Sequence, residues 1–322
     1  MNMNNKYIFL KPTFFNALWG DGSILKKYNV DKYIPKETDR NTIAGLGAFS
    51  GLSSDANEIL NGDYKGKKLN ELYDEHPELF GTPSTLKWEH IPVSMGIGYA
   101  CSDLSIQVHP TENYALKELN CHGKSESWYI VDCPHNSNIV MGHNAKTMEE
   151  LEDYIDKKDW EGLLKRYPIM PGSFYNIQAG TLHAIQKGTM FMEVCNPCPV
   201  TYRFYDYDRL DRDGKKRQLD IERAKENILI PFVCQNTYYR YRNDKGVTEI
   251  NLTDNKNFSV YKYVIDGEGK LLMPKPYLGA FVIEGTGEID GIPLKAGDCL
   301  LITAEVKELK WKGDMTILAY SG

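Results

Sequence analysis

The sequence predicts a mainly β protein of two domains, each a barrel or a sandwich. Three observations predict it. Short runs of aromatic and β-branched residues recur along the chain and are broken by Gly, Pro, Asn and Asp. Apolar residues at helical spacing appear mainly in two short stretches. The length of 322 residues leaves room for more than one hydrophobic core.

The strand-like runs in the first two thirds of the chain are 104–108, 127–131, 188–194 and 202–207. Helices are expected over about 147–166, which begins Thr-Met-Glu-Glu-Leu-Glu, and over about 220–229. Both helices look like additions to a β framework. The first of them is expected to be a helical insertion in the N-terminal domain.

The domain boundary is expected near residue 240. Residues 232–250 are polar and rich in Tyr, and a new series of strand-like runs begins at Phe258. The prediction is therefore an N-terminal domain over 1–240 and a smaller β-domain over 241–322.

A weak internal repeat supports this division. Pro171-Gly172-Ser173 and Ala296-Gly297-Asp298 are both turn-like and precede strand-like runs, and His183 of the first copy falls opposite Glu308 of the second. All seven histidines precede residue 184, so the C-terminal copy is expected to lack a metal site. The alternative is that any two β-hairpins look this similar.

Composition excludes several classes of function. Lys and Arg total 38 against 44 for Asp and Glu, a formal charge of −6, and no basic face indicates nucleic-acid binding. The start lacks a signal-peptide core, and no apolar run is long enough to cross a bilayer. We therefore expect a cytoplasmic protein without nucleic-acid or membrane partners, a monomer or weak homo-oligomer. Its seven scattered cysteines are expected to be reduced.

The segment 103–111, Asp-Leu-Ser-Ile-Gln-Val-His-Pro-Thr, carries the first candidate ligands. Side chains alternate between faces along a strand, so Gln107 and His109 are expected on one face and Ile106 and Val108 on the other. Such a pair is how a barrel wall presents two donors to its interior. A single strand histidine is more often a satisfied core or surface residue, so the pair needs further partners.

Two later segments supply those partners. The run Lys124-Ser-Glu-Ser-Trp-Tyr places Glu126 and Trp128 on one strand face, and the segment from Pro171 passes through a turn, a strand and a second turn to His183. One amide, one carboxylate and two imidazoles, with no thiolate, suit Zn²⁺ or a similar ion such as Mn²⁺, Co²⁺ or Fe²⁺. An open position for water or substrate would make the site catalytic.

Four ordered motifs carry a family resemblance. They are Gln107-Val-His-Pro, Lys124-x-Glu-x-Trp-Tyr, Pro171-Gly with the later Gly180-Thr-Leu-His-Ala, and Thr201-Tyr-Arg-x-Tyr-Asp-Tyr-Asp-Arg. Leu18-Trp-Gly, Gly188-Thr and the segment 74–81 also match. The chain resembles the class I mannose-6-phosphate isomerases of the short bacterial type, from about residue 7 to 230.

This resemblance implies a jelly-roll-like cupin barrel with a helical insertion and a second, smaller cupin-like β-domain. It also implies one divalent metal ion, with zinc expected, bound by Gln107, His109, Glu126 and His183. The family's metal-dependent reaction interconverts mannose 6-phosphate and fructose 6-phosphate through an enediol. Such chemistry needs a Lewis acid, a proton-shuttling base and cations to hold the phosphate.

The resemblance also implies substrate residues. Lys124 and Arg203 match family positions for catalysis and substrate binding, and both suit the phosphorylated sugar expected as partner, Arg203 through its bidentate fork. Ser105 is predicted as a further substrate-binding residue. For Arg203 the alternative is a structural ion pair with Asp206 or Asp208.

The chain departs from the family pattern at four positions. Gly45 and Gly47 stand where the family has Glu and Trp, Gly96 where it has Lys, and Pro199 where it has Asp. If these positions line the pocket, the pocket is expected to be roomier and less polar. One hypothesis is an isomerase with different proton-shuttling groups. The other is a divergent metal-binding paralogue with another sugar ligand and weak or no isomerase activity.

Overall fold

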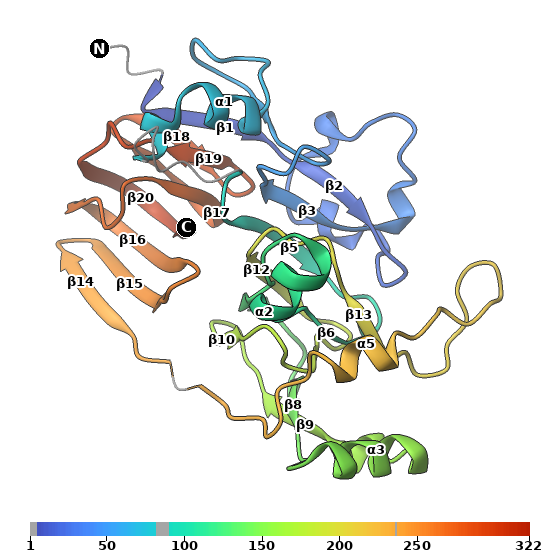
Figure 1. Cartoon of the computed structure of the whole chain (residues 1–322). Helices are drawn as coiled ribbons and strands as arrows, with labels where there is room; N and C mark the ends of the chain where they lie inside the picture. The colour runs from blue at the N-terminus through green and yellow to red at the C-terminus, as the bar shows by residue number, and fades with distance from the viewer. Residues whose placement is uncertain (1–4, 82–89, 236) are drawn as a thin grey trace.

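The computed structural model describes residues 5–81, 90–235 and 237–322, and it confirms a mainly β protein (Figure 1). Three antiparallel sheets contain its strands. Strands of the C-terminal third lie on one side of the molecule, and those of the middle third lie beside them (Figure 1).

The nine-stranded sheet has the order β14 (Arg240–Asp244), β15 (Val247–Asp254), β16 (Ser259–Leu272), β20 (Glu308–Ser321), β17 (Leu278–Ile289), β19 (Cys299–Ile302), β1 (Tyr7–Lys11) and β4 (Glu58–Ile59), with β18 (Ile292–Lys295) paired to β17. The six-stranded sheet has the order β10 (Phe174–Ile177), β7 (Glu126–Asp132), β12 (Met190–Cys195), β5 (Ser94–Tyr99), β3 (Ile43–Phe49) and β2 (Thr13–Asn16). The five-stranded sheet has the order β13 (Tyr202–Tyr205), β6 (Ile106–Val108), β11 (His183–Ala184), β8 (Asn138–His143) and β9 (Leu164–Pro168).

The α-helices are α1 (Leu69–Glu75), α2 (Glu112–Tyr114), α3 (Met148–Lys157), α4 (Trp160–Leu163) and α5 (Ile221–Lys225). A π-helical turn over Ala115–Leu119 continues α2, and short 3₁₀ turns cover Ser23–Lys26, Asp31–Tyr33, Arg40–Thr42 and Pro77–Phe80. Within the described ranges, no helix is long and apolar enough to cross a membrane.

The four predicted strand runs are confirmed as β6, β7, β12 and β13, with ends shifted by a few residues. The predicted helix over 147–166 is wrong in its last part. Thr147 caps α3 by accepting a hydrogen bond from the Glu150 amide, and Lys158 in the left-handed region ends the helix. After the short α4, Leu164–Pro168 becomes strand β9 and pairs with β8.

The second predicted helix, over 220–229, is shorter than expected, since α5 ends at Lys225. The polar stretch before Phe258 is also more regular than expected. It contains the edge strand β14 and the strand β15, which pair with each other and then with β16.

The two turn-and-strand segments of the predicted repeat have the same backbone geometry. Gly172 has φ +91° and Gly297 has φ +92°, a region that glycine adopts without strain. One residue separates each glycine from the strand that follows it, which is β10 in the first copy and β19 in the second. His183 and Glu308, at equal distances from these glycines, each begin the next strand.

The N-terminal strand does not stay with its sequence neighbours. β1 pairs with β19 over Tyr7↔Ile302 to Leu10↔Cys299, and β4 pairs with β1, so both belong to the C-terminal sheet. The division at residue 240 remains a prediction. The pairing of β1 and β4 means that two strands from before residue 240 belong to the sheet formed mainly by residues after it. One buried apolar cluster accordingly contains residues of both parts, among them Ile8, Leu46, Leu301 and Tyr320.

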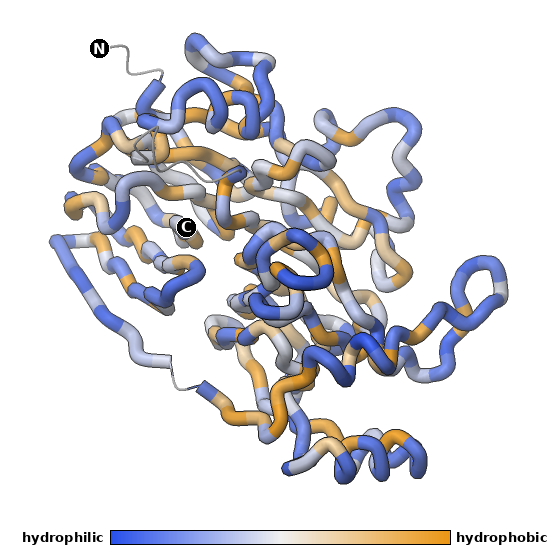
Figure 2. The backbone as a smooth tube through the Cα atoms, viewed as in Figure 1, coloured by the Kyte–Doolittle hydropathy of each residue, from blue (hydrophilic) through white to orange (hydrophobic). Residues whose placement is uncertain are grey.

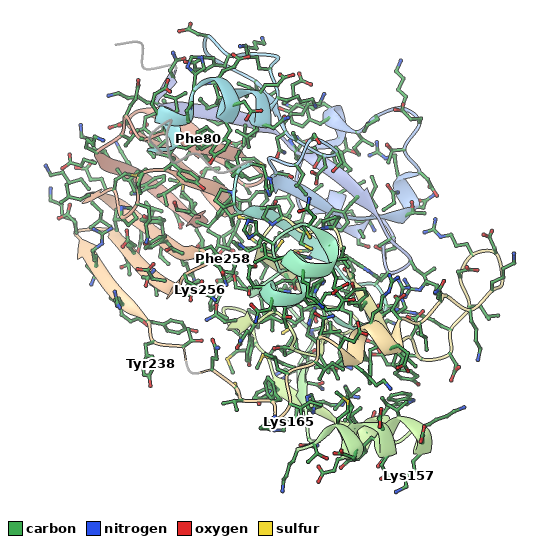
Figure 3. The ribbon with its side chains drawn as sticks, in the orientation of Figure 1. Phe80, Lys157, Lys165, Tyr238, Lys256 and Phe258 are labelled. Atoms are coloured by element: carbon green, nitrogen blue, oxygen red, sulfur yellow. The ribbon has the colours of Figure 1, made fainter. Side chains whose placement is uncertain are left out.

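Apolar and polar residues both occur along the C-terminal sheet, as the tube in Figure 2 shows; β15 begins with alternating buried and half-buried residues, whereas β19 is buried throughout. The turn between β15 and β16 carries Lys256 and Phe258 on the side of this sheet nearest the middle of the molecule (Figure 3). That turn therefore lies on the side of the C-terminal sheet that faces the N-terminal part of the chain.

Leu301→Ala should destabilise the protein by about 2–5 kcal/mol, because the fully buried leucine lies in the cluster shared by both parts. Leu272→Ala is the matched control, since Leu272 is 65% exposed and should change stability by less than about 0.5 kcal/mol. Urea denaturation followed by fluorescence and circular dichroism measures both. Equal midpoints for the two variants would show that Leu301 does not support the shared core.

Candidate metal centre

The candidate ligands come from two sheets that face each other. Gln107 lies in β6, where its register partner is His183 on one side, so the two side chains leave the five-stranded sheet on the same face. His109 follows the end of β6, and Glu126 begins β7 of the six-stranded sheet. The predicted Gln107 and His109 strand pair thus lies opposite the predicted carboxylate.

His109, Glu126 and His183 converge in the interior. Nε2 of His109 lies 2.9 Å from Oε1 of Glu126, and Nε2 of His183 lies 3.6 Å from Oε2 of the same carboxylate. One ligand atom from each residue lies within 4.8 Å of the others, and all three side chains are buried. Gln107, His109 and Glu126 line one cavity, and His183 contacts the Glu126 carboxylate.

Both imidazoles are oriented with Nε2 toward Glu126. Nδ1–H of His109 donates to the Val200 carbonyl at 3.1 Å, and Nδ1–H of His183 donates to the Thr181 carbonyl at 2.8 Å. Within the described part of the chain, neither Nε2 has a hydrogen-bond partner, and neither does Oε2 of Glu126. Backbone carbonyls that fix the tautomer in this way are typical of metal-binding histidines, because they leave the Nε2 lone pair free.

These orphaned buried atoms fit a divalent cation. Unpartnered buried nitrogen and oxygen acceptors cost free energy unless something satisfies them. Two imidazole nitrogens and one carboxylate oxygen, with an amide nearby, are the donor set that Zn²⁺ and related ions accept.

Charge is concentrated at Glu126. Nζ of Lys124 lies 2.6 Å from Oε1 of Glu126 and 3.6 Å from Oε1 of Glu193. Burial alone would raise the pKa of Glu126, but the charge of Lys124 outweighs it and holds that pKa well below the ordinary value. Burial likewise opposes the ammonium form of Lys124, yet Glu126 and Glu193 raise its pKa well above the ordinary value.

His183 is held neutral. Burial, followed by the nearby His109, lowers its pKa to about 4. At neutral pH its Nε2 therefore carries a lone pair rather than a proton.

Glu193 is a site residue that was not predicted. It lies in β12, pairs in register with Trp128 on one side and Gly96 on the other, and lines the cavity beside Lys124. Burial and the charge of Glu126 raise its pKa, which makes it a carboxyl group that can hold a proton. A single acidic residue within the apolar run Met-Phe-Met-Glu-Val-Cys was the signal that could have indicated it.

The cavity has a volume of about 220 Å³, with a polar end and an aromatic end. Its polar side chains are Gln107, His109, Lys124, Glu126, Glu193 and Thr201. Its apolar wall is formed by Phe15, Trp19, Leu104 and Phe191. The Trp19 ring lies 6.0 Å from Phe15 and 6.1 Å from Phe191, centroid to centroid, so the rings form one continuous wall.

Arg203 and Ser105 do not line this cavity. Arg203 is the register partner of Gln107, but its Nη1 donates to the Gln218 carbonyl at 3.0 Å. The alternative ion pairs are not formed either, since Asp206 binds Arg209 and Arg217. Ser105 is buried.

Asp208, the other alternative partner of Arg203, pairs with Lys216. The roles predicted for Arg203 and Ser105 therefore remain predictions.

The glycines at the departures from the family pattern face the same interior. Gly45 pairs with Gly98, and Gly47 pairs with Gly96. The Phe15 ring takes the space beside Gly45, where an added Cβ would lie 2.2 Å from Cζ. The expected extra room is thus filled at Gly45 by an aromatic ring.

Room remains beyond Gly47 and Gly96. A second cavity of about 200 Å³ is lined by both glycines and shares Lys124 and Glu193 with the first. Pro199 lies just before Thr201, which lines the first cavity.

Two family models match the chain. The catalytic domain of type I phosphomannose isomerase matches residues 8–144, and the cupin domain of mannose-6-phosphate isomerase matches residues 248–321. The mannose-6-phosphate isomerase ManA of Bacillus subtilis is 36% identical over 316 residues, which is 97% of each chain. This chain belongs to the type I mannose-6-phosphate isomerase family.

Other family members agree. The mannose-6-phosphate isomerase of Streptococcus mutans is 35% identical over 316 residues, again 97% of each chain. A crystal structure of the mannose 6-phosphate isomerase from Bacillus subtilis superposes with a TM-score of 0.91 at 35% identity, covering 98% of this chain and 100% of that one. The predicted family and cupin fold are therefore confirmed.

Lys124→Met should destabilise this family member by about 3 kcal/mol, because it leaves the buried carboxylate of Glu126 without its closest cation. Lys117→Met is the control, since the Lys117–Glu118 pair is exposed and screened by solvent, so its loss should leave stability nearly unchanged. The measurement is urea denaturation at neutral pH. A Lys124→Met variant as stable as Lys117→Met would mean that the histidines alone compensate Glu126.

Proposed function

We propose that the chain is a metal-dependent mannose-6-phosphate isomerase that interconverts mannose 6-phosphate and fructose 6-phosphate through an enediol. The observation that carries the proposal is the convergence of His109, Glu126 and His183 on one buried point beside Lys124 and Glu193. Membership of the family supports the reaction, and the cavity supplies the groups that such a reaction needs.

One divalent metal ion, with zinc proposed, would be held by His109, Glu126, His183 and Gln107. When bound, it would act as a Lewis acid that stabilises negative charge on the sugar oxygens. The chain prepares the ligands for it. Val200 and Thr181 orient the two imidazoles, and Lys124 keeps Glu126 ionised.

Glu193 and Lys124 are proposed to handle the proton and the substrate charge. Isomerisation moves a proton between C1 and C2, so a group must remove it from one carbon and return it to the other. Glu193 has a raised pKa and lies in the cavity wall, which suits that task. Lys124 is a buried cation beside it and suits an anionic oxygen of the substrate.

The aromatic residues of the cavity wall are proposed to keep water away from the reacting groups. Phe15, Trp19 and Phe191 line the cavity together with the charged groups, and Phe191 is buried. A dry wall strengthens the electrostatic interactions made by Lys124 and the metal ligands.

His183→Ala should lower both metal content and turnover by at least about 100-fold, because it removes one of three converging ligand atoms. The control is His143→Ala. His143 is also buried, but its Nε2 binds the Leu229 carbonyl away from the cluster, so metal stoichiometry and turnover should stay near wild type. Elemental analysis measures metal, and a coupled assay on mannose 6-phosphate measures turnover.

Turnover by the metal-loaded wild type no faster than that of His183→Ala would contradict isomerase activity. With metal still bound stoichiometrically, that result would favour the divergent paralogue with another sugar ligand. In that case, the replacement of the family's Lys by Gly96 and of its Asp by Pro199 would be the first candidates to explain the lost activity.

Glu193→Gln should lower kcat by about 100-fold to 10,000-fold, because the amide cannot exchange a proton with the substrate. The wild-type rate should fall as pH drops through the raised pKa of Glu193, since the carboxylate is the base. The variant should lose this acidic limb. Glu58→Gln, a surface change at the Lys11 ion pair, is the control and should keep the wild-type pH profile. An unchanged acidic limb in Glu193→Gln would assign the proton transfer to another group.

A further inference from the structure

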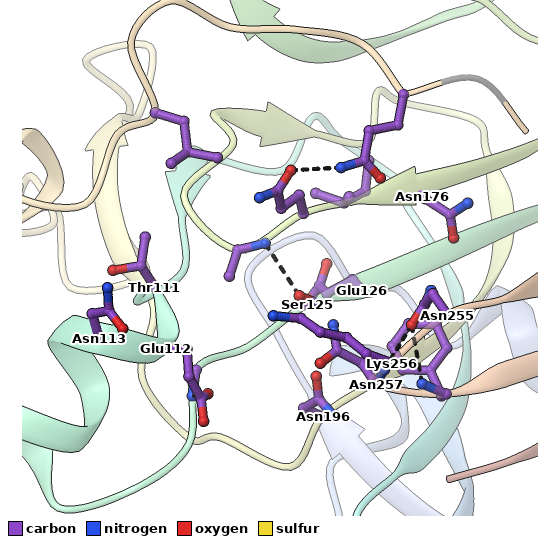
Figure 4. A pocket seen from close by; sticks show the side chains of 17 residues that line it. Thr111, Glu112, Asn113, Ser125, Glu126, Asn176, Asn196, Asn255, Lys256 and Asn257 are labelled. Atoms are coloured by element: carbon purple, nitrogen blue, oxygen red, sulfur yellow. Dashed lines mark hydrogen bonds between the residues drawn. The ribbon is translucent and has the colours of Figure 1, made fainter.

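A cavity of about 610 Å³ lies between the metal-bearing sheets and the C-terminal part of the chain, and its wall includes Glu126 of the metal centre. Figure 4 shows it from close by, with Thr111, Glu112 and Asn113 on one side and Asn255, Lys256 and Asn257 on the other. The second group belongs to the turn between β15 and β16, so both parts of the chain form its wall.

Side-chain amides dominate this cavity. Seven of its seventeen lining residues are Asn or Gln. An amide carries two donors and two acceptor positions, which matches the paired donor and acceptor character of neighbouring sugar hydroxyls.

Several of these amides have capacity left for a ligand. Oδ1 of Asn176 is buried and has no hydrogen-bond partner among the described residues. The side chains of Asn113 and Asn257 make no hydrogen bond within the part of the chain that the structure describes, and Asn196 uses only Nδ2, which donates to the Pro92 carbonyl. A buried acceptor without a partner in a cavity of this size indicates a group that a ligand or water satisfies.

Two carboxylates and one lysine line the cavity. Glu126 already contacts Lys124, His109 and His183, which leaves Glu112 and Lys256 to face a ligand. Burial favours the neutral acid, but hydrogen bonds from His122 and the Gly123 amide hold the pKa of Glu112 below its ordinary value. The Glu112 carboxylate is therefore already hydrogen-bonded to His122 and Gly123 in the cavity wall. Lys256 stands across from it as an exposed cation that can meet one anionic group.

We propose that this cavity is a second carbohydrate-binding site, which holds a hexose or hexose phosphate between the two parts of the chain. Asn176, Asn196 and Asn257 would bind the ring hydroxyls, and Lys256 would bind a phosphate where one is present. The same segments lead to the metal centre. Thr111 follows His109 closely, and Ser125 precedes Glu126 while its Oγ accepts a hydrogen bond from the Ala179 amide.

The test is a ligand-detected NMR titration of the whole chain with three probes: D-mannose, inorganic phosphate and mannose 6-phosphate. Mannose should bind saturably with an affinity on the order of millimolar. The double variant Asn176→Ala, Asn257→Ala should weaken mannose binding by about tenfold, because two amide hydrogen bonds are lost. Asn257→Ala alone should weaken it less, which keeps the test sound if the double variant folds poorly.

Two controls locate the binding. Asn243→Ala removes an exposed amide on β14 away from the cavity and should leave mannose affinity unchanged. Lys124→Met changes the metal centre and tests whether the mannose signal arises there instead. Lys256→Ala should weaken mannose 6-phosphate binding in His183→Ala protein while leaving mannose binding intact, which separates recognition of the phosphate from that of the sugar.

Three results would overturn the proposal. Mannose could fail to bind saturably, it could bind equally to wild type and to the amide variants, or only Lys124→Met could weaken it, which would place the sugar at the metal centre. Because binding is measured without turnover, these outcomes are independent of whether the chain is an active isomerase.

Discussion

The buried carboxylate of Glu126 is the constraint on which the site depends. An ionised carboxylate in an apolar interior is costly unless cations and hydrogen-bond donors surround it. Here Lys124, two residues before β7, lies next to it, and the imidazoles of His109 and His183 reach it from the side of the five-stranded sheet. The facing of the five-stranded and six-stranded sheets is therefore tied to the chemistry, since only that packing brings the ligands to one point.

The same arrangement separates the ionisation states of two neighbouring carboxyl groups. Glu126 and Glu193 both lie near Lys124, but Glu126 is closer to it and to His109, so its pKa falls while the pKa of Glu193 rises. Two acids whose environments push their pKa values apart can serve as ligand and as proton carrier within one cavity.

Sequence patterns predicted the local features of this site well and the long-range ones poorly. Gln107 and His109, expected on one strand face, line the same cavity, and His109, Glu126 and His183 converge, while their role as metal ligands remains a prediction. Glu193 was missed because a lone acid in a strand has no local partner in the sequence. The end of the helix near Leu164 was missed because pairing with β8 overrides helical spacing there, and the Phe15 ring beside Gly45 follows from register between β2 and β3.

The position of β1 has a consequence for how the molecule is made. Its partner β19 leaves the ribosome long after β1, since Tyr7 pairs with Ile302. Until then the first strand has an unpaired edge, and the sheet that buries Ile8 cannot close. Pairing across such a span is entropically expensive and slow, so β1 is expected to pair with β19 late in folding.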